Sequence, residues 1–380
     1  MTLRPAFLLT RRLILVLTAA SAAVSCSQPE TEMLRPMPAL RELVTLTAIA
    51  GSAGNPIVDV VGIDSCRLIV ADQRGAITLV ETQGALVELA VIPGGRSIHF
   101  EAVRKDRFLA WASSPPWLAR VSLNPFALDS FKAPRHKWGG VFLGPAVEFR
   151  GTIAMAPLAN PDNSHIGRSE SGDARLVDLL GPGGSTSFGG PSLPATGDYT
   201  SWRTWRGELG QTNDTLLFAA FADGTVHRMT LSSGDSLPAM ALPVYFRSVE
   251  ARTEVLRFPW IQFGNFPFFM DTPQIVTATF GPNGTLYAIR PYGYRWSPRP
   301  NQFVRKAGTW IPTRQGLEIY STNGTSFGAY AVPPDVRGIQ ADAYGRLFLL
   351  AGNDVLVMRD PSAPNTACTY PSRVPAVIED

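Results

Sequence analysis

Residues 57–92 read IVDVVGIDSCRLIVADQRGAITLVETQGALVELAVI, and this stretch decides the fold. Its β-branched runs are short and are separated by turn-forming Asp and Gly residues, which is the pattern of four strands joined by tight turns. The pattern returns at residues 273–293 (PQIVTATFGPNGTLYAIRPYG) and at residues 336–360 (VRGIQADAYGRLFLLAGNDVLVMRD). Repeats of this kind predict an architecture made of small antiparallel sheets.

The spacing of these units predicts a six-bladed β-propeller with four-stranded blades over residues 42–360. The six units begin near residues 57, 97, 139, 199, 273 and 336. The strand ELVTLTAI, residues 42–49, precedes the first unit. We expect it to supply the outer strand of the sixth blade and so close the ring. Seven blades are the alternative, since residues 181–275 have room for an extra strand pair.

The repeated units, such as Asp342-Ala-Tyr-Gly-Arg346-Leu347 between two strands, resemble six-bladed propellers of the NHL and TolB-like kind. The resemblance implies the fold. Six-bladed relatives include calcium-dependent lactonases and quinone-dependent sugar dehydrogenases, whose sites lie at the mouth of the central channel. The sequence has no set of Glu, Asn and Asp at equivalent places in successive blades, so we expect no metal and no cofactor.

The first 26 residues have the features of an export signal. Three arginines precede an apolar run, Leu13–Val24, which is too short to remain as a membrane span. The run ends in Ala23-Val24-Ser25-Cys26, which resembles a bacterial lipoprotein signal and implies a cleaved peptide of residues 1–25 with Cys26 acylated. An ordinary signal with an unmodified Cys26 is the alternative. Residues 26–41 are then a linker from the lipid, and residues 361–380 are a C-terminal tail.

Composition limits the partners and the location. The chain has 34 Lys and Arg against 31 Asp and Glu, but the excess of three equals the arginines of the signal, so the rest is neutral. Without a basic stripe, a nucleic-acid partner is not expected. Export places the protein on the periplasmic or cell-surface side of a membrane, and Ser27 after Cys26 favours the outer membrane. In that oxidising setting Cys66 and Cys368 could pair across the closure of the ring, or both could stay unpaired.

Three long segments are predicted to emerge on one rim of the propeller. They are residues 157–173 and 290–316, each between the second and third strands of a blade, and residues 246–272, which join blade four to blade five. The last two are rich in aromatic residues and Arg, the types enriched at interface hot spots. The predicted partner-binding residues are Trp260, Phe263, Phe266, Phe268, Tyr294, Arg295, Trp296 and Trp310. Alternatively, these aromatics plug the channel or cap the blade ends.

Catalytic patterns are weak. Gly324-Thr-Ser326-Phe-Gly328 matches G-x-S-x-G, but Asn323-Gly324 predicts a hairpin turn instead of the strand-to-helix turn that a nucleophile requires. The four histidines (His99, His136, His165 and His227) are far apart, and the oxygen ligands Asp162, Asn163 and Asp173 lack calcium-loop spacing. The sequence therefore favours a non-catalytic protein-binding lipoprotein, an accessory subunit of a membrane-bound complex. A metal- or quinone-dependent enzyme acting at the channel mouth is the alternative.

Overall fold

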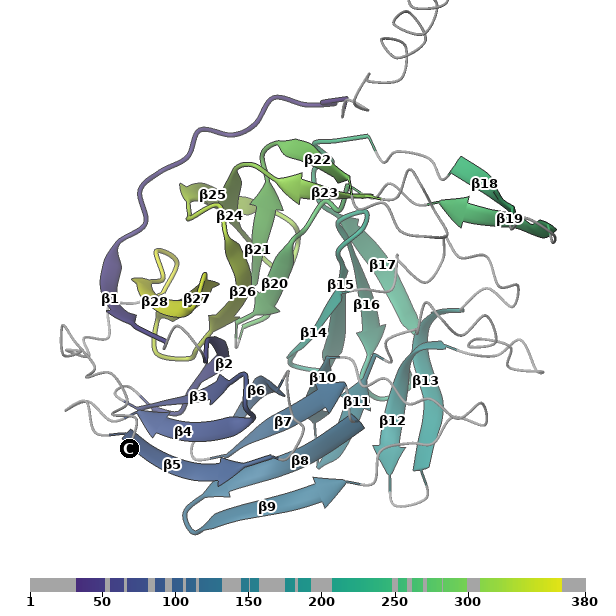
Figure 1. Cartoon of the computed structure of the whole chain (residues 1–380). Helices are drawn as coiled ribbons and strands as arrows, with labels where there is room; N and C mark the ends of the chain where they lie inside the picture. The colour runs from purple at the N-terminus through teal and green to yellow at the C-terminus, as the bar shows by residue number, and fades with distance from the viewer. Residues whose placement is uncertain are drawn as a thin grey trace, which may run out of the picture.

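The computed structural model describes residues 32–363 apart from short stretches within that range. Its elements are the strands β1 to β28, and the described residues contain no helix. Six sheets of four strands form a ring, and two further two-stranded hairpins lie outside these sheets (Figure 1). The stretches left out are 52–54, 65–66, 81–85, 93–97, 105–106, 114–115, 132–144, 150, 157–174, 182–183, 193–206, 248–251, 258–261, 269–271, 282 and 299–307.

Blades one to three follow one another along the chain, each as an antiparallel meander whose first strand lies innermost. Blade one comprises β2 (Ile57–Gly62), β3 (Leu68–Asp72), β4 (Ala76–Val80) and β5 (Leu86–Val91). Blade two comprises β6 (Ile98–Arg104), β7 (Arg107–Ser113), β8 (Pro116–Leu123) and β9 (Phe126–Phe131). Blade three comprises β10 (Ala146–Phe149), β11 (Thr152–Met155), β12 (Arg175–Gly181) and β13 (Gly184–Ser192).

Blades four to six complete the ring. Blade four comprises β14 (Gly207–Thr212), β15 (Thr215–Ala220), β16 (Thr225–Thr230) and β17 (Ser236–Ala241). Blade five comprises β20 (Thr277–Phe280), β21 (Leu286–Pro291), β24 (Gln315–Tyr320) and β25 (Ser326–Ala331). Blade six comprises β26 (Val336–Ala341), β27 (Arg346–Ala351), β28 (Asp354–Arg359) and β1 (Thr45–Ile49). The predicted six blades are confirmed; the first strands of blades one, two and six begin within one residue of the predicted starts, and those of blades three, four and five begin four to eight residues later.

The core consists of apolar clusters between neighbouring blades. Blade one meets blade two through a cluster that includes Ile69, Ile77, Phe100 and Phe108, and the two phenylalanine rings pack edge to face with centroids 5.2 Å apart. A corresponding cluster joins each other pair of neighbours, including blade six and blade one. Because both faces of a blade are covered, inner strands such as β21 and β27 are buried along nearly their whole length, whereas the outer strands β9 and β17 are largely exposed.

The N-terminal strand closes the ring as predicted. β1 pairs antiparallel with β28, with Ile49 opposite Val355, so the first and last strands share one sheet. Ile49 is buried against blade one, and Leu43, just before β1, is buried against blade five. The seven-bladed alternative is wrong. The extra strand pair in residues 181–275 exists as β18 (Arg252–Arg257) and β19 (Gln262–Phe268), but it forms a separate hairpin and no blade.

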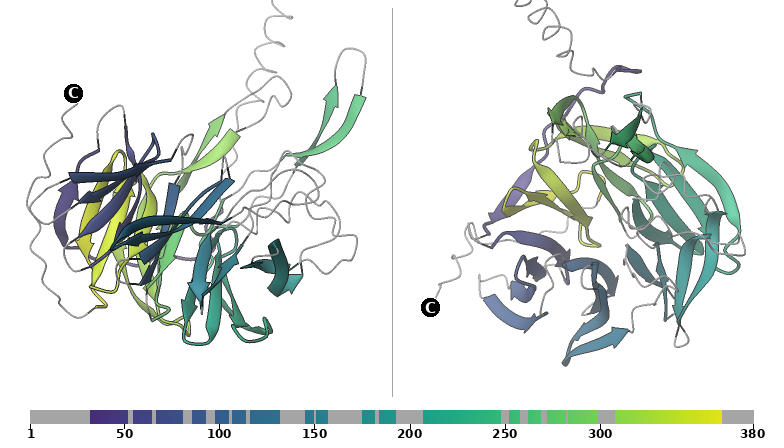
Figure 2. Two further views of the ribbon diagram at one scale, coloured as in Figure 1. Left: turned by 90° about the horizontal axis from the view of Figure 1, so that it is seen from below. Right: turned by 45° about the vertical axis from the view of Figure 1, so that its right-hand side comes forward.

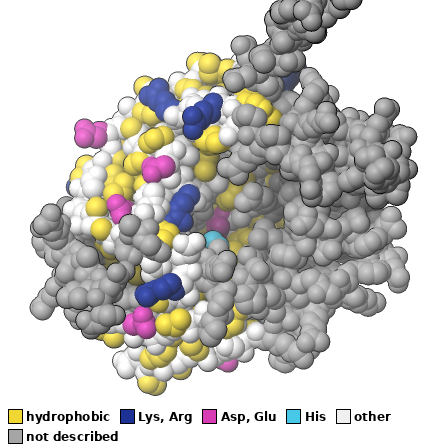
Figure 3. Space-filling model, in the orientation of Figure 1, with side chains coloured by type: hydrophobic (Ala, Val, Ile, Leu, Met, Phe, Trp, Pro, Cys, Tyr) yellow, Lys and Arg dark blue, Asp and Glu magenta, His cyan; other side chains and the backbone are white. Residues whose placement is uncertain are grey.

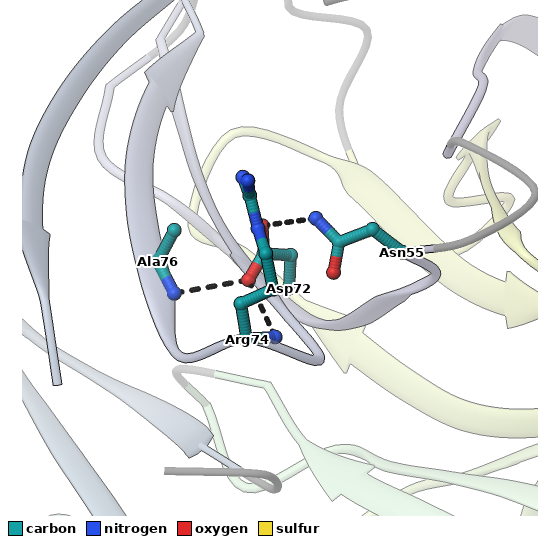
Figure 4. Close-up of polar contacts among 4 residues, drawn as sticks. All are labelled: Asn55, Asp72, Arg74 and Ala76. Carbon is teal, nitrogen blue, oxygen red and sulfur yellow. Dashed lines mark hydrogen bonds and ion pairs between the residues drawn. The ribbon is translucent and has the colours of Figure 1, made fainter. Parts of the chain in front are cut away.

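The repeated Asp-x-x-Gly pattern is a turn device. Asp72 Oδ1 accepts hydrogen bonds from the backbone N–H groups of Arg74 at 2.9 Å and Ala76 at 3.0 Å, and Asn55 donates to the other carboxylate oxygen (Figure 4). Gly75 supplies the left-handed conformation, with φ of 89°. In blade one this turn joins the second and third strands, whereas in blade six its counterpart at Asp342 joins the first and second. The pattern therefore marks tight turns, and it does not mark one fixed place in the blade.

Candidate functional site

The two hairpins outside the ring occur at the predicted insertions. The hairpin β18–β19 lies between blades four and five, and the hairpin of β22 (Tyr294–Pro298) and β23 (Gly308–Pro312) lies between the second and third strands of blade five. Viewed from the side, both project from the same face of the ring (Figure 2, left). We call it the hairpin face. The third predicted insertion, residues 157–173, lies outside the described residues.

A buried carboxylate holds the bases of these insertions. Glu318, in the third strand of blade five, is 2% exposed and accepts hydrogen bonds from three tyrosine hydroxyls. Tyr292 donates at 2.7 Å and Tyr245 at 3.1 Å, and Tyr320 donates as well. Burial raises the pKa of Tyr245 and Tyr292 far above the ordinary tyrosine value, and the negative charge of Glu318 raises it further. These phenols therefore remain protonated and act as donors to Glu318.

Arg290 and Gln274 complete the base of the insertions. Arg290 is fully buried, its guanidinium lies 4.9 Å from the centre of the Tyr245 ring, and it donates to the carbonyl of Pro243. Its Nε and Nη1 have no hydrogen-bond partner among the described residues. Gln274 accepts a hydrogen bond from the backbone N–H of Tyr245 and donates to the carbonyl of Phe246. The hydrogen bonds of Gln274 thus hold the backbone at the start of the insertion that carries β18–β19.

Aromatic contacts continue from this base into the hairpin β22–β23. The ring of Tyr294 packs against Phe246, with centroids 5.1 Å apart, and against Trp310 at 6.4 Å. Trp296 packs on Trp310 at 5.3 Å, opposite it in the ladder of the hairpin. Trp310 is only 6% exposed, whereas Arg295 is exposed, and Tyr294 and Trp296 are half-buried. Trp310 therefore stiffens the hairpin from within, and Arg295 and Trp296 lie where a partner can touch them.

The remaining predicted rim residues belong to or adjoin β19. Phe263, Phe266 and Phe268 lie in this strand, for which the structure describes the backbone, and Trp260 lies outside the described residues. The structure thus brings Tyr294, Trp296 and Trp310 into contact. Glu318 and its three tyrosines were not predicted as site residues from the sequence. Their one signal is a single acidic residue within the apolar run Leu317–Tyr320.

The segment that precedes β1 runs along the outside of blades four and five. The N–H of Leu34 donates to the carbonyl of Tyr245 at 2.8 Å, and the N–H of Arg247 donates to the carbonyl of Glu32 at 3.0 Å. Farther along, Arg41 exchanges backbone hydrogen bonds with Ala329 and Ala331 in β25, at 2.9 and 2.8 Å. We call residues 32–41 the strap; within the predicted linker, this part contacts the propeller.

Acidic side chains gather at the mouth of the channel. The first strands of all blades start at the hairpin face, because each follows a connection between blades. Asp59, Glu101 and Glu208 lie in three of these inner strands, and acidic and histidine side chains are visible at the centre of the ring (Figure 3). Burial, followed by the negative charge of Asp59, raises the pKa of Glu101 well above its ordinary value. Burial and the charges of Glu101 and Asp59 do the same for the pKa of Glu208.

Hydrogen bonds link four blades at this level of the channel. Asp59 accepts from the backbone N–H of Phe100 at 2.9 Å. Gln340 of blade six donates to the carbonyl of Phe100 at 3.1 Å and accepts from Thr279 of blade five at 3.3 Å. Nδ1 of His99 lies 3.5 Å from Asp59, and its ring stacks on Trp111. Sequence analysis did not foresee this meeting of carboxylates. Among the described residues no three His, Cys, Asp or Glu side chains are arranged to hold a metal ion.

The other sequence candidates have plain structural roles or lie outside the description. Ser326 is exposed at the start of β25, directly after the turn at Gly324 (φ of 86°), so the predicted hairpin turn is confirmed and no nucleophile elbow forms. His227 is partly buried in β16, and burial lowers its pKa. The residues outside the described part of the chain are Cys26, Cys66, Cys368, His136, His165, Asp162, Asn163 and Asp173.

Comparison with known proteins finds similarity to solved structures and to no family model or curated protein. The chain is similar to the structure described as "Crystal structure of WD40 beta propeller domain of Doa1", with 13% sequence identity and a TM-score of 0.44 over 86% of this chain and 98% of that chain. The protein is a six-bladed β-propeller, an assignment that rests on its own six sheets and their interfaces.

Proposed function

We propose that this protein is a non-catalytic binding propeller that recognises a protein partner through its hairpin face. The observation that carries the proposal is the pair of hairpins on one face, one of them built on the buried Glu318 network. A propeller needs no such additions to close its ring. Arg and Trp are the residue types enriched at interface hot spots, and the hairpin β22–β23 presents an exposed Arg295 beside a half-buried Trp296.

The proposal includes export and a lipid anchor. The basic start, the short apolar run and Cys26 support a lipoprotein held on the periplasmic or cell-surface side of a membrane, the outer membrane by the Ser27 argument. An accessory subunit of a membrane-bound complex fits such an anchor. The NHL and TolB-like kind of propeller remains a resemblance carried by the sequence. Among the described residues no helix is long and apolar enough to span a membrane.

The test is a pull-down of the tagged full-length chain from its native membranes in mild detergent, with bound proteins identified by mass. We expect a stoichiometric partner that is lost when Trp296 is replaced by Ala. Phe327→Ala is the matched control, because Phe327 is an exposed aromatic residue (49%) near the opposite face of the ring, and it should leave the partner bound. Equal loss in both variants, or recovery of the protein alone, would contradict the proposal.

A second candidate function follows from the carboxylates at the channel mouth. Asp59, Glu101 and Glu208 converge from three blades, and a raised pKa suits a carboxyl group that donates a proton. A hydrolase or a metal- or quinone-dependent enzyme of the propeller class would act at this place. The test is turnover of lactones and sugars by the purified chain with and without added Ca²⁺. Activity that is lost in Glu101→Gln but kept in Trp296→Ala would favour the enzyme over the binding module.

A further inference from the structure

The N-terminal strap brings the chain to the base of the hairpin β18–β19. Glu32 accepts a backbone hydrogen bond from Arg247, and the two side chains form an exposed ion pair with Nη1 and Oε2 2.9 Å apart. Met33 forms a β-bridge with Phe246. Arg247 precedes the first residue of β18, Arg252, by only five positions. The described chain therefore starts at the connection that leads into the hairpin, and on the far side of the ring from β5 and β9 (Figure 1).

The tether between this point and the lipid is short. Cys26 precedes Glu32 by six positions. A fully extended chain spans at most about 3.5 Å per residue, so the acylated cysteine lies within roughly 20 Å of Glu32. The six residues of β18 span a similar length, about 20 Å at 3.3 Å per residue. The hairpin projects from the place where the tether begins, and the two have similar lengths (Figure 2, left). A membrane surface within reach of the tether is therefore also within reach of the hairpin.

We propose that the hairpin face of the propeller is turned toward the membrane that holds Cys26, and that β18–β19 and the start of the strap rest on the lipid headgroups. This inference rests on the lipid anchor of the proposed function. It adds an orientation and a second contact to that anchor. A contact of the folded domain with the headgroups adds to the attachment that the lipid on Cys26 provides and fixes the orientation of the propeller.

The residue types around the tether fit a bilayer surface. Met33 and Leu34 are large apolar side chains that are 59% and 47% exposed, and both belong to the strap. Arg35 and Arg247 are exposed in the same region. Apolar side chains enter the boundary between headgroups and acyl chains, and arginines pair with lipid phosphates. The strand β19 adds Phe263, Phe266 and Phe268 to this part of the sequence. Aromatic residues are enriched at membrane interfaces.

This orientation has consequences for the candidate sites. The mouth of the channel with Asp59, Glu101 and Glu208 opens on the same face and therefore also points toward the membrane. A protein partner of the hairpin face is then one embedded in that membrane, because a soluble protein would have to enter the narrow space beneath the propeller. The opposite face, with the turns at 213–214, 232–235 and 322–324, points away into the aqueous compartment.

Hydrogen exchange on the full-length lipidated chain tests the proposal. The protein is reconstituted in vesicles of phosphatidylethanolamine and phosphatidylglycerol, and its amide exchange is compared with that in detergent micelles. We expect exchange in β18–β19 and at residues 32–36 to slow roughly tenfold or more on vesicles. Exchange at the turns of the opposite face should stay the same, and these turns serve as the internal control.

Three results would overturn the proposal. Equal exchange of β18–β19 in vesicles and micelles would mean that this hairpin does not touch lipid. Slower amide exchange of β18–β19 in native membranes but not in pure lipid vesicles would mean that the hairpin face contacts a membrane protein and not the lipid. Absence of acyl mass on Cys26 would remove the fixed end of the tether. In the first two cases the pull-down of the protein partner can still succeed, so a failure of the orientation is distinguishable from a failure of the proposed function; missing acyl mass would instead contradict the lipid anchor on which both rest.

A variant series measures the second contact without the anchor. The chain with Cys26→Ser is mixed with the same vesicles, and the bound fraction is determined by flotation. Adding Phe266→Ser and Phe268→Ser should lower the bound fraction several-fold, whereas adding Phe327→Ser should leave it unchanged. Circular dichroism checks that each variant is folded. An unchanged bound fraction in the β19 variant would count against lipid contact by this hairpin.

Discussion

Two buried arginines in different regions of the molecule differ in how far the surrounding residues compensate their charge. Arg346 lies at the closure between blades six and one, where it forms an ion pair with Asp342 and donates to the carbonyl of Asp64. Arg290 lies beneath the hairpin face, where it is more deeply buried, yet two of its nitrogens lack hydrogen-bond partners among the described residues. The described part of the chain pairs Arg290 with no carboxylate within ion-pair distance.

The difference separates a region built for stability from one that is not. At the closure between blades six and one, the ion pair with Asp342 compensates the buried charge of Arg346 and so helps to keep the ring closed. Under the hairpins, Trp310 and Gln315 join Arg290 in having buried polar atoms without a partner among the described residues. Buried polar atoms without a partner also occur elsewhere among the described residues, in Asn55, Arg107, Gln211 and Arg228, so the contrast holds between the two arginines and does not by itself mark the hairpin face as a functional site.

The largest effect is expected from breaking the compensated pair at the closure. Asp342→Ala leaves the charge of Arg346 buried without its carboxylate and also removes two turn hydrogen bonds, so the free energy of unfolding should fall by about 3–5 kcal/mol. Urea unfolding measures it. Asp223→Ala, which removes one hydrogen bond from an exposed turn, is the control and should cost less than about 1 kcal/mol. Similar losses in both variants would mean that the closure has no special status.

A smaller and more local effect is expected at the hairpin base. Glu318→Gln keeps the size of the side chain but replaces a shared carboxylate acceptor of three tyrosines, so it should cost about 2 kcal/mol. Amide exchange in β22–β23 should speed up, while exchange in blades one and two stays the same. Uniform acceleration over the whole ring would show that the network supports the fold in general and not the hairpins in particular.

The channel mouth extends the comparison to acidic groups. The pKa of Glu208 is raised in the folded state, so its protonated form favours folding, and stability is lost as the pH rises above the ordinary glutamate range. Glu208→Gln should remove this loss and raise the Tm at pH 8 by roughly 2–4 °C, with little change at pH 4. Thermal unfolding across this range measures the difference. A pH dependence that is the same in both proteins would exclude Glu208 as its source.

The smallest effect is expected at Arg290, whose buried charge is not compensated by a carboxylate among the described residues. Arg290→Met removes a buried cation with two unpaired nitrogens, but it also removes the hydrogen bond to the Pro243 carbonyl and the contact with the Tyr245 ring, so the free energy of unfolding should fall by only about 1 kcal/mol. Arg346→Met at the closure is the matched control and should be clearly destabilising, because it strands Asp342. If the two substitutions cost the same, the contrast between the regions is not energetic.

Local pattern was enough to predict the blades. Alternating and β-branched runs between Gly, Asn and Asp turns mark strands because side-chain period and turn chemistry are short-range properties. The closing strand at Thr45–Ile49 and the hairpin turn at Gly324 were predictable for this reason. The places of the two insertions followed from counting strands within each blade. The rim residues were predicted by type alone, so the burial of Trp310 within its hairpin could not be foreseen.

The sequence alone therefore carried the number of blades, the closure and the sites of insertion, since each is written in contiguous residues. The meeting of Asp59, Glu101 and Glu208, and of Glu318 with its tyrosines, depended on the folded ring. Apart from the pair Glu318 and Tyr320, these residues lie tens to more than a hundred positions apart and become neighbours only in the folded ring. Electrostatic coupling depends on distance in space, which no local pattern of side chains encodes.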